Sequence, residues 1–79
     1  MEDQRIDVYI SDNNTECERL VDFLQEADIS FTLKNTTENK QHLTDLQKNN
    51  IYLTPAIIID DHYQVIGFQP DKIRRFLRK

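Results

Sequence analysis

Apolar and polar side chains alternate over residues 5–10 and then change to a longer spacing. A period of two predicts a strand, here with Ile6, Val8 and Ile10 on its apolar face. After the polar residues 11–14, apolar side chains recur every three or four residues, which predicts a helix with one buried stripe. That stripe, with Phe23 on its flank, consists of Cys17, Leu20, Val21, Leu24 and Ala27.

A second alternation spans residues 29–33 and predicts a second strand. A strand, a helix and another strand at this spacing form a β-α-β unit, so the two strands are expected to run parallel with a right-handed crossover. Residues 37–48 begin with helix-start signals but carry a thin apolar stripe, chiefly Leu43 and Leu46. We therefore expect an amphipathic, largely exposed helix that is the least stable element.

An uninterrupted apolar run, residues 56–59, follows Pro55. Such a run predicts a strand that is buried on both faces. A short turn at residues 60–62 and a returning segment at residues 63–66 complete a predicted antiparallel hairpin. Gly67 is the only glycine of the chain, so we expect it at a tight bend or at a close approach of two backbone segments.

A last helix is predicted to start within residues 68–71, with Pro70 and Asp71 in its first turn. Its buried face consists of Ile73, Phe76 and Leu77. The predicted order is β-α-β-α-β-β-α, an α/β fold with a four-stranded mixed sheet flanked by helices. With 79 residues, the chain is expected to form a single domain over residues 1–79.

The start of the first helix has two possible capping arrangements. Asn13 with Glu16, or Thr15 with Glu18, would each form a capping box, and the sequence does not choose between them. Either arrangement puts Cys17 in the first turn, where the helix dipole favours a thiolate. The adjoining glutamates and burial of the stripe oppose the thiolate, so an inert core thiol is the favoured interpretation.

Composition narrows the class of protein. A net charge of −4 argues against broad binding to nucleic acid or to anionic membranes. No apolar run approaches the roughly 20 residues that span a bilayer, and no basic and apolar leader opens the chain, so we expect a cytoplasmic protein. The single cysteine excludes an internal disulfide and a cysteine-based zinc site, and we expect no metal or other cofactor.

Basic side chains gather at the end of the chain. The last eight residues hold no acid and five basic residues, which are Lys72, Arg74, Arg75, Arg78 and Lys79. A contact with an acidic partner or RNA is one interpretation, but a solvated helix face that complements the helix dipole is favoured. His42 and His62 are interpreted as surface histidines, because their spacing does not suggest that they converge with Cys17 on a metal.

Four features carry a resemblance to a known family. One predicted strand ends in Tyr9-Ile10-Ser11, and Cys17 lies in the first turn of the helix that follows. Thr54-Pro55 leads into the buried strand, and Gly67-Phe68-Gln69-Pro70-Asp71 leads into the last helix. With the element order, which covers nearly the whole chain, these features resemble the minimal thioredoxin fold of the glutaredoxins. The match is closest to the redoxins of ribonucleotide reductase, the NrdH-type glutaredoxin-like proteins.

The resemblance implies a redox site that lacks its attacking sulfur. In the Cys-x-x-Cys motif of this family, the first cysteine attacks a substrate disulfide and the second resolves the mixed disulfide. Cys17 aligns with the second cysteine, and Asn14 stands in place of the first. The resemblance also implies that Thr54-Pro55 is a threonine–cis-proline pair facing this site. Without a second sulfur, dithiol exchange within one chain cannot occur, so we expect no dithiol oxidoreductase activity.

Glutathione is not expected as a partner. Relatives that use glutathione carry a basic residue before the motif and a Gly-Gly pair near the last helix. Here those places hold Ser11-Asp12 and Gly67-Phe68. The NrdH-type redoxins are thought to take electrons from thioredoxin reductase instead, which would have no disulfide to reduce in this chain.

Two functions follow as hypotheses. The first is a glutaredoxin-like redox protein in which Cys17 forms mixed disulfides with a thiol-containing protein. The second is a non-catalytic binding module that holds a protein or peptide partner in a groove. The residues expected at that groove are Tyr9, Tyr52, Thr54, Pro55, Gly67 and Phe68.

Overall fold

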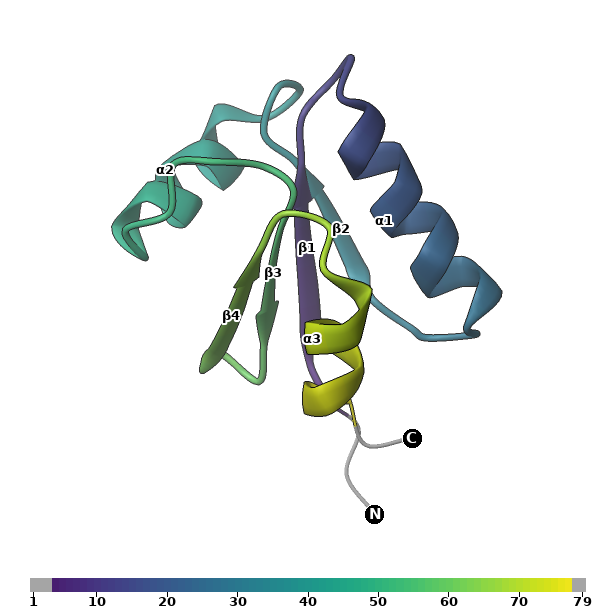
Figure 1. The fold of residues 1–79 in the computed structure, drawn as a ribbon. Coiled ribbons are helices and arrows are strands. Elements are labelled where there is room, and N and C mark those ends of the chain that lie inside the picture. Colours follow the sequence, from purple (N-terminus) through teal and green to yellow (C-terminus); the bar gives the residue numbers. More distant parts are fainter. Residues whose placement is uncertain (1–3, 78–79) are drawn as a thin grey trace.

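The computed structural model describes residues 4–77 and has three helices around one sheet (Figure 1). In chain order the elements are β1 (Ile6–Ile10), α1 (Thr15–Glu26), β2 (Thr32–Asn35), α2 (Lys40–Lys48), β3 (Ala56–Ile59), β4 (Tyr63–Ile66) and α3 (Pro70–Phe76). The strand order is β2-β1-β3-β4, with β1 parallel to β2 and antiparallel to β3, and β3 antiparallel to β4. This confirms the predicted α/β fold with a mixed four-stranded sheet.

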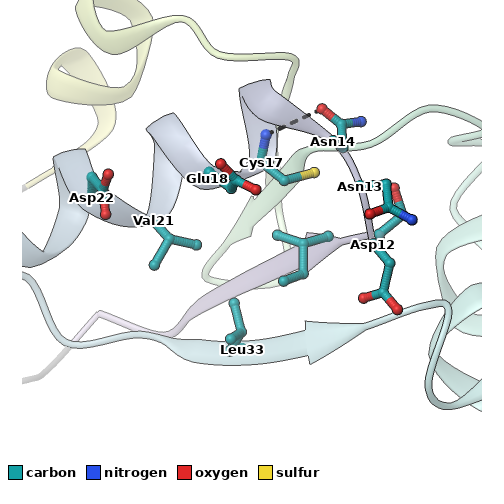
Figure 2. A pocket seen from close by; sticks show the side chains of 10 residues that line it. Asp12, Asn13, Asn14, Cys17, Glu18, Val21, Asp22 and Leu33 are labelled. Atoms are coloured by element: carbon teal, nitrogen blue, oxygen red, sulfur yellow. Dashed lines mark hydrogen bonds between the residues drawn. The ribbon is translucent and has the colours of Figure 1, made fainter.

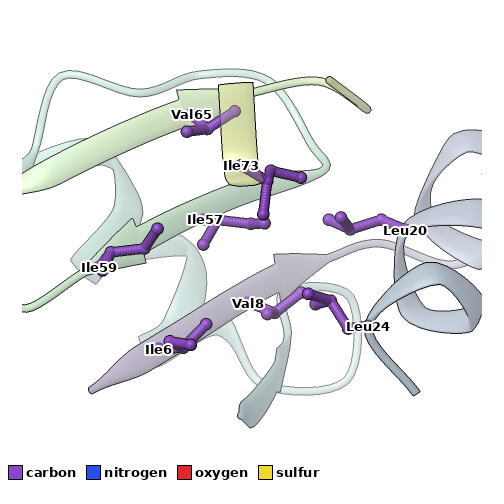
Figure 3. Packing of buried hydrophobic residues seen from close by; sticks show 8 residues of the cluster. All are labelled: Ile6, Val8, Leu20, Leu24, Ile57, Ile59, Val65 and Ile73. Atoms are coloured by element: carbon purple, nitrogen blue, oxygen red, sulfur yellow. The ribbon is translucent and has the colours of Figure 1, made fainter. Parts of the chain in front are cut away.

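The main core lies on the face of the sheet that α1 and α3 cover (Figure 3). Its eight buried residues are Ile6, Val8, Leu20, Leu24, Ile57, Ile59, Val65 and Ile73. They come from three strands and two helices, so this cluster holds both α1 and α3 against the sheet. Burial of one such aliphatic side chain contributes about 1.5–3 kcal/mol, which makes this cluster the main source of stability.

A smaller core lies on the opposite face, under α2. Its five buried residues are Tyr9, Leu46, Ile51, Ala56 and Ile58. Asp7 is also buried on this side and forms ion pairs with Arg5 (3.2 Å) and Lys34 (3.6 Å). A buried carboxylate needs such partners, because desolvation otherwise disfavours its charge. Strand β1 is therefore buried on both faces, although its sequence alternates.

Strand β2 begins at Thr32, later than the predicted residue 29. Ile29 and Phe31 still pack against the main core, but they do so from the connection before the strand. Leu33 is 47% exposed, because β2 is an edge strand that α1 covers only in part. The alternation in the sequence thus correctly marked Ile29 and Phe31 as side chains that reach the core. It did not show where hydrogen bonding between the strands begins.

Helix α2 begins at Lys40, three residues after the predicted start. The side-chain oxygen of Asn35 accepts hydrogen bonds from the backbone N–H groups of Thr37 and Glu38, which holds these residues in a turn. The helix is amphipathic as predicted, with Leu46 buried and Leu43 38% exposed.

Both longer helices end in the same way, with a residue in the left-handed conformation. Asp28 (φ 61°) follows α1, and Asn50 (φ 62°) follows α2. The next residue in each case, Ile29 or Ile51, donates its backbone N–H to the carbonyl of the residue five positions earlier, at 3.0 and 3.2 Å. This is a Schellman motif, in which glycine is usual and asparagine or aspartate is tolerated.

The hairpin between β3 and β4 turns at Asp60 and Asp61, whose φ angles are 56° and 57°. His62 donates its N–H to the carbonyl of Ile59 at 3.0 Å, which closes the turn. Gly67 follows β4 with a φ of 83°, and its N–H donates to the carbonyl of Pro55 at 2.7 Å. The predicted turn is confirmed, and of the two roles expected for Gly67 the structure shows the bend, since a Cβ added there would meet no atom within 4 Å.

Helix α3 has the predicted buried face. Ile73 is fully buried, and Phe76 and Leu77 pack against the main core. Two of the basic residues expected on its solvated face, Arg78 and Lys79, lie outside the described residues.

Candidate functional site

The site is built where β1 ends and α1 begins. Asn14 is the N-cap of α1, and its side-chain oxygen accepts hydrogen bonds from the N–H groups of Glu16 (3.0 Å) and Cys17 (3.2 Å). Neither capping arrangement expected from the sequence forms. Asn13 takes a φ of 59°, which turns the chain so that the next residue is extended and caps the helix, and Thr15 is already helical.

Asn14 also connects the helix start to the segment before β3, residues 51–55, which we call the Pro55 loop. Its Nδ2 donates to the carbonyl of Thr54 at 3.3 Å. The hydroxyl groups of Ser11 and Thr54 form a second link at 2.7 Å. Both ends of the Asn14 amide are thus engaged, one with α1 and the other with the Pro55 loop.

Cys17 is a free thiol with 2% of its surface exposed. It lies in the first turn of α1, and its side chain is directed toward the turn at Asn13 and Asn14 (Figure 2). The prediction that it belongs to the buried stripe is confirmed. As the only cysteine of the chain it has no partner for an internal disulfide.

The Pro55 loop presents apolar side chains to solvent. Tyr52 is 69% exposed and Leu53 is 67% exposed, whereas Pro55 is buried. The Thr54–Pro55 peptide bond is cis, and the carbonyl of Pro55 accepts the N–H of Gly67. The Thr54-Pro55 pair and the segment that starts at Gly67 therefore meet in space, and Asn14 contacts the first of them.

Two residues expected at the groove pack against the cores, Tyr9 fully and Phe68 in part. Tyr9 is only 4% exposed and belongs to the smaller core under α2, with the ammonium of Lys34 5.4 Å from its ring centre. Phe68 is half-buried and packs edge-to-face against Phe23 of α1, at 6.0 Å between ring centres. Tyr9 is directed to the opposite face because it follows Val8 on a strand, so its expected place in an open groove is corrected.

A pocket of about 310 Å³ opens beside Asn14 and Cys17 (Figure 2). Its floor is apolar and includes Ile10, Val21 and Leu33. Its rim is acidic and includes Asp12, Glu18 and Asp22. It lies between α1 and the edge strand β2, and neither Thr54 nor Pro55 lines it. Sequence reasoning missed this pocket, because its walls come from segments that only the crossover brings together.

The two histidines do not join this site. His42 is half-buried in α2, and its Nδ1 is buried with no hydrogen-bond partner within residues 4–77. His62 is exposed and stacks edge-on against Tyr63. Over the described part of the chain, no three histidine, cysteine, aspartate or glutamate residues are placed to hold a metal ion. Within the same residues, no helix is long and apolar enough to cross a bilayer.

Comparison with known proteins gives three findings. The thioredoxin domain family matches residues 4–78. The Gene 56 protein of Mycobacterium phage D29 is 29% identical over 69 residues, which cover 86% of this chain and 77% of that protein. The thioredoxin-like protein BC3987 superposes with a TM-score of 0.85 at 24% identity, over 92% of this chain and all of that one.

A further structural neighbour is the glutaredoxin-like NrdH-redoxin from Escherichia coli, which has a thioredoxin-like activity profile. Its TM-score is 0.82 at 21% identity, with 95% of this chain and 97% of that chain covered. At these identities the solved structures show the shared fold, which is that of the thioredoxin and glutaredoxin redox proteins.

Proposed function

We propose that this chain, which belongs to the thioredoxin domain family, is a degenerate member that binds a protein or peptide partner without dithiol turnover. The observation that carries the proposal is the state of the two motif positions. Asn14 is engaged at both ends of its amide, and Cys17 is 2% exposed. Dithiol exchange needs an accessible attacking thiolate and a second thiol, and this site supplies neither.

A binding surface for the partner is supported by the Pro55 loop. Tyr52 and Leu53 are large, apolar and about two-thirds exposed, which is typical of side chains that a partner covers. The loop is held from behind by Ser11 and Asn14, so its backbone is positioned before a partner arrives. In this proposal Thr54, Pro55 and Gly67 fix the loop, and the exposed pair makes the contact.

The substitution Asn14→Cys tests the proposal at the motif. In the proposed protein the site geometry is intact and only the attacking sulfur is lacking. The variant is therefore expected to form an internal disulfide with Cys17 and to gain turnover in a disulfide-reduction assay with thioredoxin reductase. The wild type should show no turnover with either thioredoxin reductase or glutathione, and turnover by the wild type would contradict the proposal.

A matched control is Asn39→Cys, which places a thiol at the N-cap of α2. The two caps have the same extended backbone, but α2 has no cysteine at its third helical position. This variant carries two thiols at the starts of different helices, so it should form no internal disulfide and should remain inactive. A well-folded Asn14→Cys variant that does not oxidise would show that the site has diverged in geometry as well as in sequence.

A second candidate is a redox role for Cys17 itself, and one observation favours it. Cys17 lines the pocket between α1 and β2, although little of its surface is exposed. Its thiolate would attack a partner disulfide, release one partner thiolate and remain in a mixed disulfide until another thiol displaced it. The segment Gly67–Asp71 supports a closeness to NrdH-type redoxins, and a reducing, cytoplasmic location would suit this role.

Alkylation separates the two candidates. If Cys17 is a core residue, iodoacetamide should react slowly in buffer and rapidly once urea unfolds the chain. The rate in buffer should then follow the unfolding equilibrium. Rapid modification of the folded protein would favour the redox candidate and count against the first proposal.

A further inference from the structure

We propose that the free edge of β2 binds an extended, basic peptide segment of a partner protein as a fifth strand. This surface is separate from the Pro55 loop. The loop leads into β3, which lies on the opposite side of β1 from β2, and neither Thr54 nor Pro55 lines the pocket beside β2. We call it the β2 groove and define it by Asp12, Glu18, Asp22 and Leu33.

The edge of β2 is open. Within residues 4–77, β2 pairs with β1 alone, so its outer backbone N–H and C=O groups face away from the sheet. An exposed edge is a template for an incoming strand, because main-chain hydrogen bonds can continue the ladder. Leu33, at the middle of this edge, is 47% exposed. A lysine on an edge strand can hinder pairing with another strand. Here the side chain of Lys34 does not do so, because it is directed toward Asp7 and Tyr9.

Pockets lie on both sides of this edge. The 310 Å³ pocket lies on the α1 side, and a pocket of about 470 Å³ lies on the α2 side, with Leu33 lining both. Alternate side chains of a strand point to opposite faces of a sheet. A peptide paired with β2 would therefore present one set of alternate side chains to the α1 side, where the 310 Å³ pocket lies.

The charge of the groove selects a basic peptide. Asp12, Glu18 and Asp22 line the α1-side pocket, and Glu38 lines the α2-side pocket, with no lysine or arginine lining either one. Within the described residues, no oppositely charged side chain forms an ion pair with Glu18 or Asp22. The apolar floor suits the aliphatic stem of arginine or lysine, whose cationic end would reach the acidic rim.

The test uses a capped pentapeptide that alternates valine and arginine, titrated into the ¹⁵N-labelled protein. Amide shifts are expected in residues 32–35 and around Glu18 and Asp22. The double variant Glu18→Gln/Asp22→Asn should bind about fivefold more weakly, because two charge contacts are lost. The control Glu16→Gln/Asp71→Asn makes the same change of net charge away from the groove and should bind within about twofold of wild type.

Strand pairing is tested with the same peptide carrying N-methyl groups on alternate amides. Methylation on the edge that faces β2 should abolish the shifts, and methylation on the other edge should leave them. The proposal is overturned if the two N-methylated peptides bind equally, if both double variants weaken binding alike, or if the shifts centre on Tyr52 and Leu53. It is also overturned if β2 is occupied by a second copy of this chain, seen as self-association in sedimentation.

Discussion

Helices α1 and α2 are built from the same parts but hold different positions in the molecule. Each begins at an asparagine whose side chain caps the helix, Asn14 or Asn39, and each ends in a Schellman motif. Helix α1 buries three residues, whereas α2 buries only Leu46. Similar capping signals thus give two helices that are buried to different extents. Tertiary packing, and not the local signals, decides how much each helix adds to the stability of the fold.

The cap of α1, like its buried face, makes more tertiary contacts than the cap of α2. The amide of Asn14 caps α1 and also donates to the Pro55 loop, whereas the side-chain oxygen of Asn39 accepts the N–H of Gln41 within its own helix. The third helical position is the buried Cys17 in α1 and the half-buried His42 in α2. The comparison teaches that a helix cap can also hold a neighbouring segment, as Asn14 holds the Pro55 loop.

The largest expected contrast is in the two cores. Leu24→Ala should lower the free energy of unfolding by about 3–5 kcal/mol, and Leu46→Ala by about 2–3 kcal/mol. Both side chains are buried, but Leu24 lies in the eight-residue cluster and Leu46 in the five-residue one. Urea unfolding followed by circular dichroism measures both values. Equal losses would mean that the two faces of the sheet contribute alike.

The next contrast is in the caps. Asn14→Ala should cost about 2 kcal/mol, because it removes a helix cap and the hydrogen bond to Thr54. Asn39→Ala removes a cap alone and should cost about 1 kcal/mol. The same unfolding experiment compares them. A larger loss at Asn39 would argue that the link from Asn14 to the Pro55 loop has no energetic weight.

The smallest contrast concerns the end of α2. Asn50→Gly should raise the free energy of unfolding by about 0.5 kcal/mol, because a left-handed residue then carries no Cβ. Asn49→Gly is the matched control, since Asn49 has a φ of −92° and its side chain donates to the carbonyl of Asp45. That change should lower stability by about 1 kcal/mol. If both substitutions change the free energy of unfolding in the same direction, the left-handed conformation of Asn50 is not what determines the stability of this helix end.

Much of the fold could be predicted from local pattern. The spacing of Cys17, Leu20 and Leu24 marked the buried face of α1, and the run at residues 56–59 marked a strand buried on both faces. Such patterns are reliable because one period corresponds to one secondary structure. The single glycine was also informative, since its bend and its contact with Pro55 both formed.

Other features depended on contacts that the sequence does not display. Asn14 competed with Asn13 and Thr15 for the cap, and the turn geometry decided between them. Tyr9 and Asp7 occupied what resembled a polar face of β1, yet α2 covers that face and Lys34 neutralises the carboxylate. The groove at β2 arises only when the crossover sets α1 beside an edge strand.

The central place of β1 has a consequence for how the chain is made. Strand β1 leaves the ribosome before β3, with which it pairs where Ile6 meets Ile59. Synthesis must therefore pass residue 59 before these two strands can pair, and contacts this distant in sequence form slowly. Until then, the strand that leads into Asn14 is held by α1 and β2 but lacks β3, so a nascent chain that stops before residue 56 has no finished site to offer a partner.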